Sequence, residues 1–233
     1  MTWPLVYLLA FVVGSFPTGL VLGRLHGIDI RKHGSGNIGA TNVGRVLGPK
    51  AWVQCFSVDL LKGLLPTLAV GWWAGLIGRW VIEPGQATLW LIAMLMPILG
   101  HMFSPWLKFK GGKGVATGLG TILAVYPTLT FAGVLALAVF LIALAKWKYV
   151  SLGSILAGIT LPIAVVIQFT VFHLLRDQMF PAPGPELPWT ALVYFILTFT
   201  IAALVFVKHR SNVARLKAGT EPKVGQRKPA VAS

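Results

Sequence analysis

Three polar segments interrupt an otherwise apolar chain, and the first of them carries groups that bind anions. This first segment, residues 34–45, reads GSGNIGATNVGR and contains four glycines. Glycine lets the main chain bring its N–H groups close to a ligand, and the guanidinium group of Arg45 matches a phosphate. Its other candidate donors are Ser35, Gly36, Asn37, Gly39, Thr41 and Asn42. The segment could therefore bind a phosphate, and a solvated glycine-rich loop is the alternative.

The second segment, residues 100–117, places two glycines and a lysine at the start of an apolar run. Gly111, Gly112 and Lys113 would combine backbone donors, a helix N-terminus and an ammonium group. It is not a Walker A loop, because Gly114 rather than Ser or Thr follows the lysine. The alternative is that its lysines only set membrane topology. His101, near the start of the segment, is interpreted as a structural, hydrogen-bonded histidine.

The third segment, residues 208–221, follows the last apolar run. If the last helix continues into it, His209, Asn212 and Arg215 lie on one face, since residues three apart are neighbours on a helix. Gly219 and Glu221 close the segment. The alternative is an ordinary basic end of a membrane helix.

Several other chemistries are excluded. The first segment formally matches G-x-G-x-x-G, but a dinucleotide fingerprint requires a strand in a βαβ unit before it, and an apolar helix precedes it here. No G-x-S-x-G elbow and no His-x4-Asp pair of the common acyltransferases occur. Six scattered acidic residues and a single cysteine, Cys55, offer no metal cluster and no intrachain disulfide. We expect no metal, nucleotide or other cofactor.

The elements that position these segments are membrane helices. The chain has 233 residues, of which 56% are hydrophobic and 11% charged, whereas soluble domains carry about 25% charge. Runs long enough to cross a bilayer occupy residues 3–23, 51–82, 87–107, 115–145, 150–175 and 189–207. No basic residue precedes the first run, and Arg24, Arg31 and Lys32 follow it, which indicates a retained helix with its N-terminus outside.

The run 115–145 is too long for one crossing, and Pro127 interrupts it. If it crosses twice, 17 of the 20 Lys and Arg residues lie on one side of the membrane. The positive-inside rule then predicts an all-α protein with seven transmembrane helices, its N-terminus outside and its C-terminus cytoplasmic. We expect one domain over residues 1–221 and a disordered tail over 222–233.

Charged residues also occur outside the three segments. Asp59 and Lys62 lie at i, i+3 inside the second run, where a paired structural role is expected because intramembrane charge is costly. The net charge of +14 would suit nucleic acid in a soluble chain. In a chain this apolar, anionic lipid and phosphorylated substrates are the better explanation.

Together the three segments resemble the acyl-phosphate-dependent glycerol-3-phosphate acyltransferase family of bacterial membranes. Residues 35–45, 100–117 and 209–221 look like its three motifs, and SGNIGATN and FKGGKGVAT are the most specific stretches. The chain departs from the family pattern at Ser104, which intervenes before Pro105, and in a longer proline-rich loop at 173–188.

The resemblance implies transfer of an acyl group from acyl phosphate to the 1-hydroxyl of sn-glycerol 3-phosphate, giving lysophosphatidic acid and inorganic phosphate. This is the first acylation of bacterial phospholipid synthesis, in the inner membrane and at its cytoplasmic face. On this resemblance we assign the acyl phosphate to the donors of the first segment with Gly111 and Gly112, its tail lying in membrane lipid. The glycerol phosphate is assigned to Arg45, Lys113, Ser151 or Ser154, His209, Asn212 and Arg215.

The catalytic candidates are Ser35, Arg45, Lys113, His209 and Asn212, with Asp59, Lys62, His101, Gly219 and Glu221 in supporting roles. The proton acceptor stays open between a substrate phosphate oxygen and a histidine, His101 or His209. A transporter of organic phosphates is the competing class, although the polar segments gather at one face rather than at the midplane. A scaffold without activity would leave three anion-suited segments unexplained.

Overall fold

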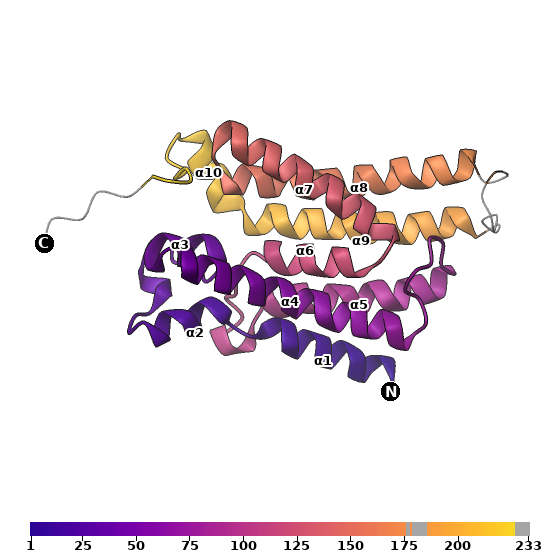
Figure 1. Ribbon diagram of the computed structural model, residues 1–233, viewed down its shortest axis with the longest axis horizontal. Coiled ribbons are helices and arrows are strands. Elements are labelled where there is room, and N and C mark those ends of the chain that lie inside the picture. The colour runs from indigo at the N-terminus through magenta and orange to yellow at the C-terminus, as the bar shows by residue number, and fades with distance from the viewer. Residues whose placement is uncertain (176–177, 179–185, 227–233) are drawn as a thin grey trace, which may run out of the picture.

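The chain folds into a bundle of helices, and the computed structural model describes residues 1–175, 178 and 186–226 (Figure 1). Within these residues the structure contains helices, turns and irregular connections but no strand. The helices, in chain order, are α1 (Trp3–Ser15), α2 (Thr18–Leu25), η1 (Ile30–Lys32), α3 (Ala40–Leu47), α4 (Pro49–Trp73), α5 (Pro84–Met102), η2 (Pro105–Leu107), α6 (Val115–Ala124), α7 (Thr128–Trp147), α8 (Val150–Leu174), α9 (Leu187–Lys208) and α10 (Arg210–Lys217).

Within the described residues, six helical stretches are long and apolar enough to cross a membrane. They are Trp3–Leu25, Pro49–Trp73, Pro84–Leu107, Thr128–Trp147, Val150–Leu174 and Leu187–Lys208. The predicted all-α fold with helices long and apolar enough to cross a membrane is therefore confirmed for the part of the chain that the structure describes. The remaining apolar helix, α6, has 10 residues and is about 15 Å long, half of a hydrocarbon core of ~30 Å. The seventh crossing stays a prediction.

The run 115–145 consists of two helices, as predicted. α6 ends at Ala124 and α7 begins at Thr128, directly after Pro127. The two helices run in opposite directions along the bundle (Figure 1). Thr130 Oγ1 donates to the Leu123 carbonyl oxygen across the turn at 2.9 Å, which satisfies one of the carbonyls that the end of α6 leaves free.

The first run differs from the prediction of one continuous helix. α1 ends at Ser15, and α2 starts at Thr18 after Phe16 and Pro17. A proline disfavours helical geometry in the residue before it and lacks an N–H donor, so Pro17 ends α1. The second run is also shorter than predicted, because α4 ends at Trp73 and an irregular connection follows.

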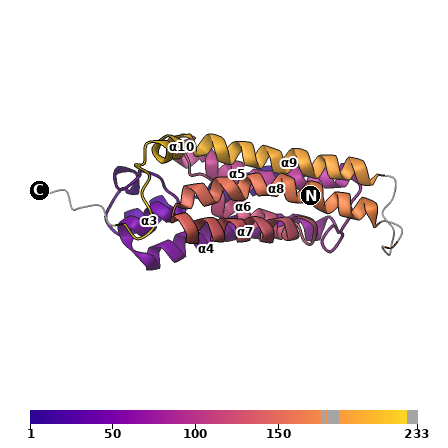
Figure 2. The ribbon, with the colours of Figure 1, turned by 90° about the horizontal axis from the view of Figure 1, so that it is seen from above.

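The polar segments collect at one end of the bundle. Both views place α3 and α10 at the end opposite the chain's N-terminus (Figures 1 and 2). The orientation of this end relative to the membrane stays a prediction. Most of the predicted tail and of the proline-rich loop lies outside the described residues. Residues 222–226 are described, and there Val224 N–H donates to the Lys148 carbonyl oxygen at 2.8 Å.

The bundle packs around α5, whose membrane-crossing stretch is the most enclosed of the six. Trp90 of α5 is completely buried and donates its indole N–H to the Thr67 carbonyl oxygen of α4 at 3.1 Å. α6 lies directly against α4: a Cβ added at Gly120 would come within 2.1 Å of the Leu60 carbonyl oxygen. This close approach fixes the start of α6, and with it Lys113, relative to α4.

Candidate active site

The carboxylate of Glu221 joins two separate parts of the bundle at its polar end. Its Oε1 accepts hydrogen bonds from Ser151 Oγ at 2.7 Å and Asn212 Nδ2 at 2.6 Å, and its Oε2 accepts from Arg215 Nε at 2.7 Å. Ser151 lies in the first turn of α8, whereas Asn212 and Arg215 lie on α10. Only 7% of Glu221 is exposed. We call these four residues the Glu221 cluster.

The chain reaches this position by turning back at the end of α10. Gly219 takes a φ of +68°, a conformation that glycine adopts without strain. The N–H groups of Thr220 and Glu221 then both bond to the Arg215 carbonyl oxygen, at 2.9 and 3.2 Å. Burial raises the pKa of Glu221, but its three side-chain hydrogen bonds and the charge of Arg215 lower it more. Glu221 is therefore ionised at neutral pH.

Lys113 extends the Glu221 cluster toward α6. Its Nζ donates to Asn212 Oδ1 at 2.5 Å, so the Asn212 amide bridges the lysine and the Glu221 carboxylate. Burial lowers the pKa of Lys113 to about 8; the Glu221 charge opposes this shift, and Arg215 and Arg45 add to it. An ammonium group has three N–H donors, so two remain for an anion.

His209 lies between α9 and α10 and is 2% exposed. Its Nδ1 is 2.8 Å from the Val205 carbonyl oxygen, and because a carbonyl only accepts, Nδ1 carries the proton and Nε2 is an acceptor. Burial, followed by the charge of Lys113, lowers the pKa of His209 to about 4. The imidazole is therefore neutral at pH 7.

Arg45 connects the first and third segments. It lies in the last turn of α3, and its Nη2 donates to the Pro222 carbonyl oxygen at 3.1 Å, one residue beyond Glu221. Two charged groups of the predicted site thus lie near Glu221: Arg45 bonds to the next residue, Pro222, and Lys113 is connected to the carboxylate through Asn212. Their positive charge is only partly balanced there, which favours an anionic ligand.

Asn42 holds the loop of the first segment in place. Its Oδ1 accepts from Ser35 N–H at 2.8 Å, and its Nδ2 donates to the carbonyl oxygens of Ile30, His33 and Asn37 at 3.3, 3.1 and 2.8 Å. Asn42 is 2% exposed, whereas Ser35 is exposed. The loop thus presents its serine to solvent while its last asparagine organises the backbone. Contact of either side chain with a ligand stays a prediction.

The two glycines of the second segment bring the chain back over the end of α5. Gly111 N–H donates to the Met102 carbonyl oxygen at 3.2 Å, and Gly112 N–H donates to that of His101 at 3.1 Å. A Cβ at Gly111 would lie 2.0 Å from the His101 carbonyl oxygen. Glycine is required for this approach, which places Lys113 beside Asn212. Because both N–H groups bond to α5, their assignment to a ligand stays a prediction.

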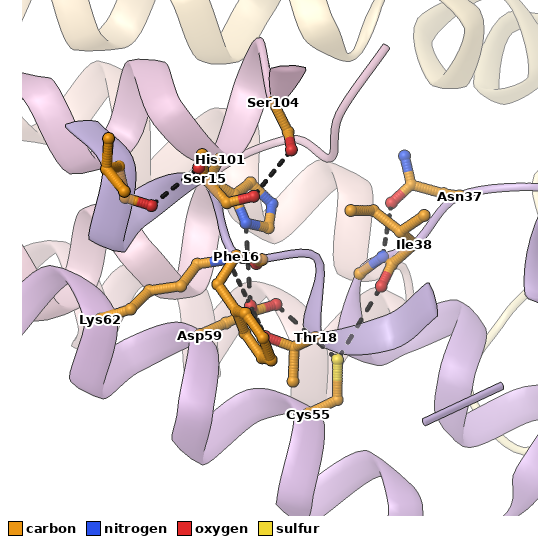
Figure 3. Close-up of polar contacts among 12 residues, drawn as sticks. Ser15, Phe16, Thr18, Asn37, Ile38, Cys55, Asp59, Lys62, His101 and Ser104 are labelled. Carbon is orange, nitrogen blue, oxygen red and sulfur yellow. Dashed lines mark hydrogen bonds and ion pairs between the residues drawn. The ribbon is translucent and has the colours of Figure 1, made fainter. Parts of the chain in front are cut away.

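The structure brings together only part of the predicted set. The Glu221 cluster, Lys113, His209 and Arg45 meet at one place, whereas Ser154 donates to the Val150 carbonyl oxygen of its own helix at 2.8 Å. Asp59, Lys62 and His101 form a separate buried group (Figure 3). The predicted continuous last helix is interrupted at His209, yet Asn212 and Arg215 share a face as predicted, since both bind Glu221.

Lys208 is a residue for which the sequence predicted no role. Its Nζ donates to the Met102 carbonyl oxygen at 2.7 Å and lies 4.2 Å from the centre of the Phe103 ring. It therefore connects the end of α9 to the end of α5, within the first residues of the second segment. Its only sequence signal is its place beside His209. Within the described residues, no three His, Cys, Asp or Glu side chains converge as a metal site.

Fold and site together define a class: a helical membrane protein with a cluster of charged side chains at one end of its bundle. The comparisons with known proteins make this specific. The sequence model of the glycerol-3-phosphate acyltransferase family matches residues 4–219. The chain therefore belongs to this family and is an acyltransferase.

Relatives and solved structures agree with this assignment. A glycerol-3-phosphate acyltransferase of Trichlorobacter lovleyi is 45% identical over 92% of this chain and 93% of its own. A glycerol-3-phosphate acyltransferase 2 of Moorella thermoacetica is 40% identical over 97% and 99%. The crystal structure of PlsY, an integral membrane glycerol 3-phosphate acyltransferase, in its glycerol 3-phosphate form matches with a TM-score of 0.73 at 33% identity, over 96% of each chain. Its lysophosphatidic acid form gives a TM-score of 0.70 at 32% identity.

Proposed function

We propose that this protein transfers an acyl group from acyl phosphate to the 1-hydroxyl of sn-glycerol 3-phosphate. The bond between the acyl carbon and the phosphate oxygen breaks, an ester bond to the glycerol oxygen forms, and the hydroxyl proton passes to the released phosphate. The products are lysophosphatidic acid and inorganic phosphate. The PlsY structures in glycerol 3-phosphate and lysophosphatidic acid forms support the acceptor and the product.

The observation that carries the proposal is the convergence of three cations, Lys113, Arg45 and Arg215, around Glu221 and its neighbours Asn212 and Pro222. Lys113 uses one N–H for Asn212, Arg215 uses its Nε for Glu221, and Arg45 uses Nη2 for Pro222. Each cation therefore keeps donors for a phosphate. These three residues bind the glycerol phosphate, with His209, Asn212 and Ser151 completing the pocket.

The first segment binds the acyl phosphate head group. Its exposed residues Ser35 and Gly36 lie on the loop that Asn42 organises, and Thr41 and Gly39 flank the start of α3. Donors aimed at the carbonyl oxygen and at the leaving phosphate stabilise the charge that develops during transfer. The acyl tail extends from this loop into the bilayer.

A dedicated protein base is not required by this proposal. Phosphate is a good leaving group, so holding the hydroxyl against the acyl carbon provides much of the rate enhancement, and a substrate phosphate oxygen takes the proton. His209 is the rival base, since its neutral ring offers Nε2 as an acceptor. His101 is a weaker rival, because its ring packs against Gly112 on the inner side of the second segment.

We place the site on the cytoplasmic face of the bacterial inner membrane, with the N-terminus outside and seven crossings. The grouping of basic residues at the end of the bundle that carries α3 and α10 supports this orientation. α6 makes the seventh crossing, and the lysines of residues 108–113 before it lie at the cytoplasmic surface.

The test is release of phosphate from acyl phosphate by the purified protein in detergent. We expect release to depend on glycerol 3-phosphate, and to be lost in Lys113→Ala. Lys110→Ala removes an exposed lysine three residues earlier and is the matched control. A transporter would not release phosphate from acyl phosphate. Absence of glycerol 3-phosphate-dependent release from the wild-type protein would therefore refute the proposal.

A further inference from the structure

A charged group is buried inside the bundle, away from the Glu221 cluster. Asp59 and Lys62 of α4 are 2% and 6% exposed, and Lys62 Nζ lies 2.8 Å from Asp59 Oδ1 (Figure 3). Charges within a membrane-crossing helix are costly and usually functional. A buried ion pair is also weak evidence for stability, because apolar residues of similar size often replace such pairs without loss. The contacts around the pair indicate a more specific role.

Lys62 supports the break between α1 and α2. Its Nζ donates to the Phe16 carbonyl oxygen at 2.7 Å, and Ser104 Oγ donates to that of Ser15 at 2.7 Å. The end of α1 leaves such carbonyls without helical partners, which is expensive inside a membrane. Ser104, the residue that departs from the family pattern, is thus an integral part of this connection and is 1% exposed.

Asp59 is connected to the first segment through Thr18 and Cys55. Its Oδ1 accepts from Thr18 Oγ1 at 2.8 Å, and its Oδ2 lies 3.7 Å from Cys55 Sγ. The same sulfur is 3.8 Å from the Ile38 carbonyl oxygen, in the middle of the first segment. A Cβ at Gly19 would come within 1.8 Å of that oxygen, so the loop rests directly on the first turn of α2.

His101 connects the same carboxylate to the second segment. Its Nδ1 lies 3.8 Å from Asp59 Oδ1 and is buried without a hydrogen-bond partner. On the other side of the ring, a Cβ at Gly112 would lie 2.2 Å from Nε2. Gly112 directly precedes Lys113. The imidazole therefore fills the space between the buried carboxylate and the residue that positions the lysine.

We propose that Asp59 and His101 are positioning residues, which set the first and second segments at the separation that acyl transfer needs. The inference rests on the proposed function, in which these segments hold the two substrates. Both segments are rich in glycine and would otherwise sample many conformations. Reacting groups must be held within about 0.5 Å of the productive geometry. The Asp59 carboxylate provides this constraint, because it contacts Thr18 and Cys55 next to the first segment and lies beside His101, which packs against Gly112 of the second.

The test separates positioning from simple stabilisation. Asp59→Asn alone leaves Lys62 buried without a counter-charge and is expected to destabilise the protein. The double variant Asp59→Asn/Lys62→Gln removes both charges and keeps an N–H donor at position 62 for the Phe16 carbonyl oxygen. We expect it to melt near the wild-type temperature in detergent, while kcat/KM for glycerol 3-phosphate falls about tenfold or more. A double variant with wild-type melting and wild-type kcat/KM would overturn the inference.

A second comparison covers the case in which the double variant does not fold. Thr18→Val removes one hydroxyl from Asp59 and leaves the ion pair intact, whereas Thr18→Ser keeps the donor. We expect Thr18→Val to reduce kcat/KM several-fold and Thr18→Ser to restore it. Thr67→Val is the control within α4, because that hydroxyl bonds to Gly63 of its own helix.

Equal kcat/KM values for Thr18→Val and Thr18→Ser would refute the positioning role. An inactive wild-type protein would instead refute the proposed function, so the two failures are distinguishable.

Discussion

Replacing Glu221 by glutamine keeps the size of the side chain and removes the negative charge that Lys113 faces through Asn212. In the wild-type protein the pKa of Lys113 is about 8. Only the protonated lysine attracts a phosphate, and kcat/KM reports ionisations of the free enzyme. We therefore predict that kcat/KM for glycerol 3-phosphate falls as the pH rises through about 8, and that this fall moves to lower pH in Glu221→Gln.

The size of the shift follows from the geometry. Two hydrogen bonds of 2.5 and 2.6 Å and an amide group separate the two charges. At a separation of about 7 Å and an effective dielectric constant of about 20, the interaction is about 2 kcal/mol, and partial solvation of Lys113 reduces it to about 1.4 kcal/mol or one pKa unit. At pH 7.5 the protonated fraction of Lys113 would then fall from about three quarters to about one quarter.

The assay is initial-rate phosphate release in detergent between about pH 6.5 and 9.5 at constant ionic strength, with melting temperatures measured in parallel. Lys113→Arg is the control: arginine does not titrate in this range, so its kcat/KM should show no fall near pH 8. An unchanged pH profile in a folded Glu221→Gln protein, or the same fall near pH 8 in Lys113→Arg, would refute this account of the site.

Three further substitutions test other contacts. Gly112→Ala should reduce activity at least about 100-fold, which corresponds to about 2.7 kcal/mol of activation free energy, because the new Cβ would lie 2.2 Å from His101 Nε2. Gly118→Ala is the control, since the nearest atom to its new Cβ is 3.8 Å away and activity should persist. Asn212→Ala removes the bridge between Lys113 and Glu221 and should lower kcat/KM about 100-fold. A lower melting temperature with unchanged kcat/KM would contradict this prediction. His209→Gln should retain kcat within about tenfold at saturating glycerol 3-phosphate; a loss of about 1,000-fold would instead identify a histidine base.

The sequence predicted what is local and compositional. Apolar runs and basic loops predicted a helical membrane protein, and Pro127 correctly divided the run 115–145, because a proline disrupts a helix wherever it lies. The same reasoning applied to Pro17 would have divided the first run, whose continuous hydrophobicity concealed the break between α1 and α2.

The contacts between distant segments could not be predicted in this way. Glu221 was expected only to support the site, yet it contacts Ser151, 70 positions away in the chain. No residue pattern specifies that pairing, since it depends on where Gly219 turns the chain and on how α8 packs against α9. The link from Asp59 to both glycine-rich segments likewise arises from the packing of α2, α4 and α5.

The late position of Glu221 in the chain has a consequence for biogenesis. Arg45 contacts Pro222 across 177 positions, so at about 5–20 residues per second roughly 10–35 s of synthesis separate the two halves of the site. During that interval Arg45 lacks Pro222, and until α10 has been made Lys113 lacks Asn212. The polar end of the nascent bundle is thus a cationic surface until translation delivers the carboxylate. The Glu221 cluster is therefore complete only after the turn at Gly219 has been synthesised.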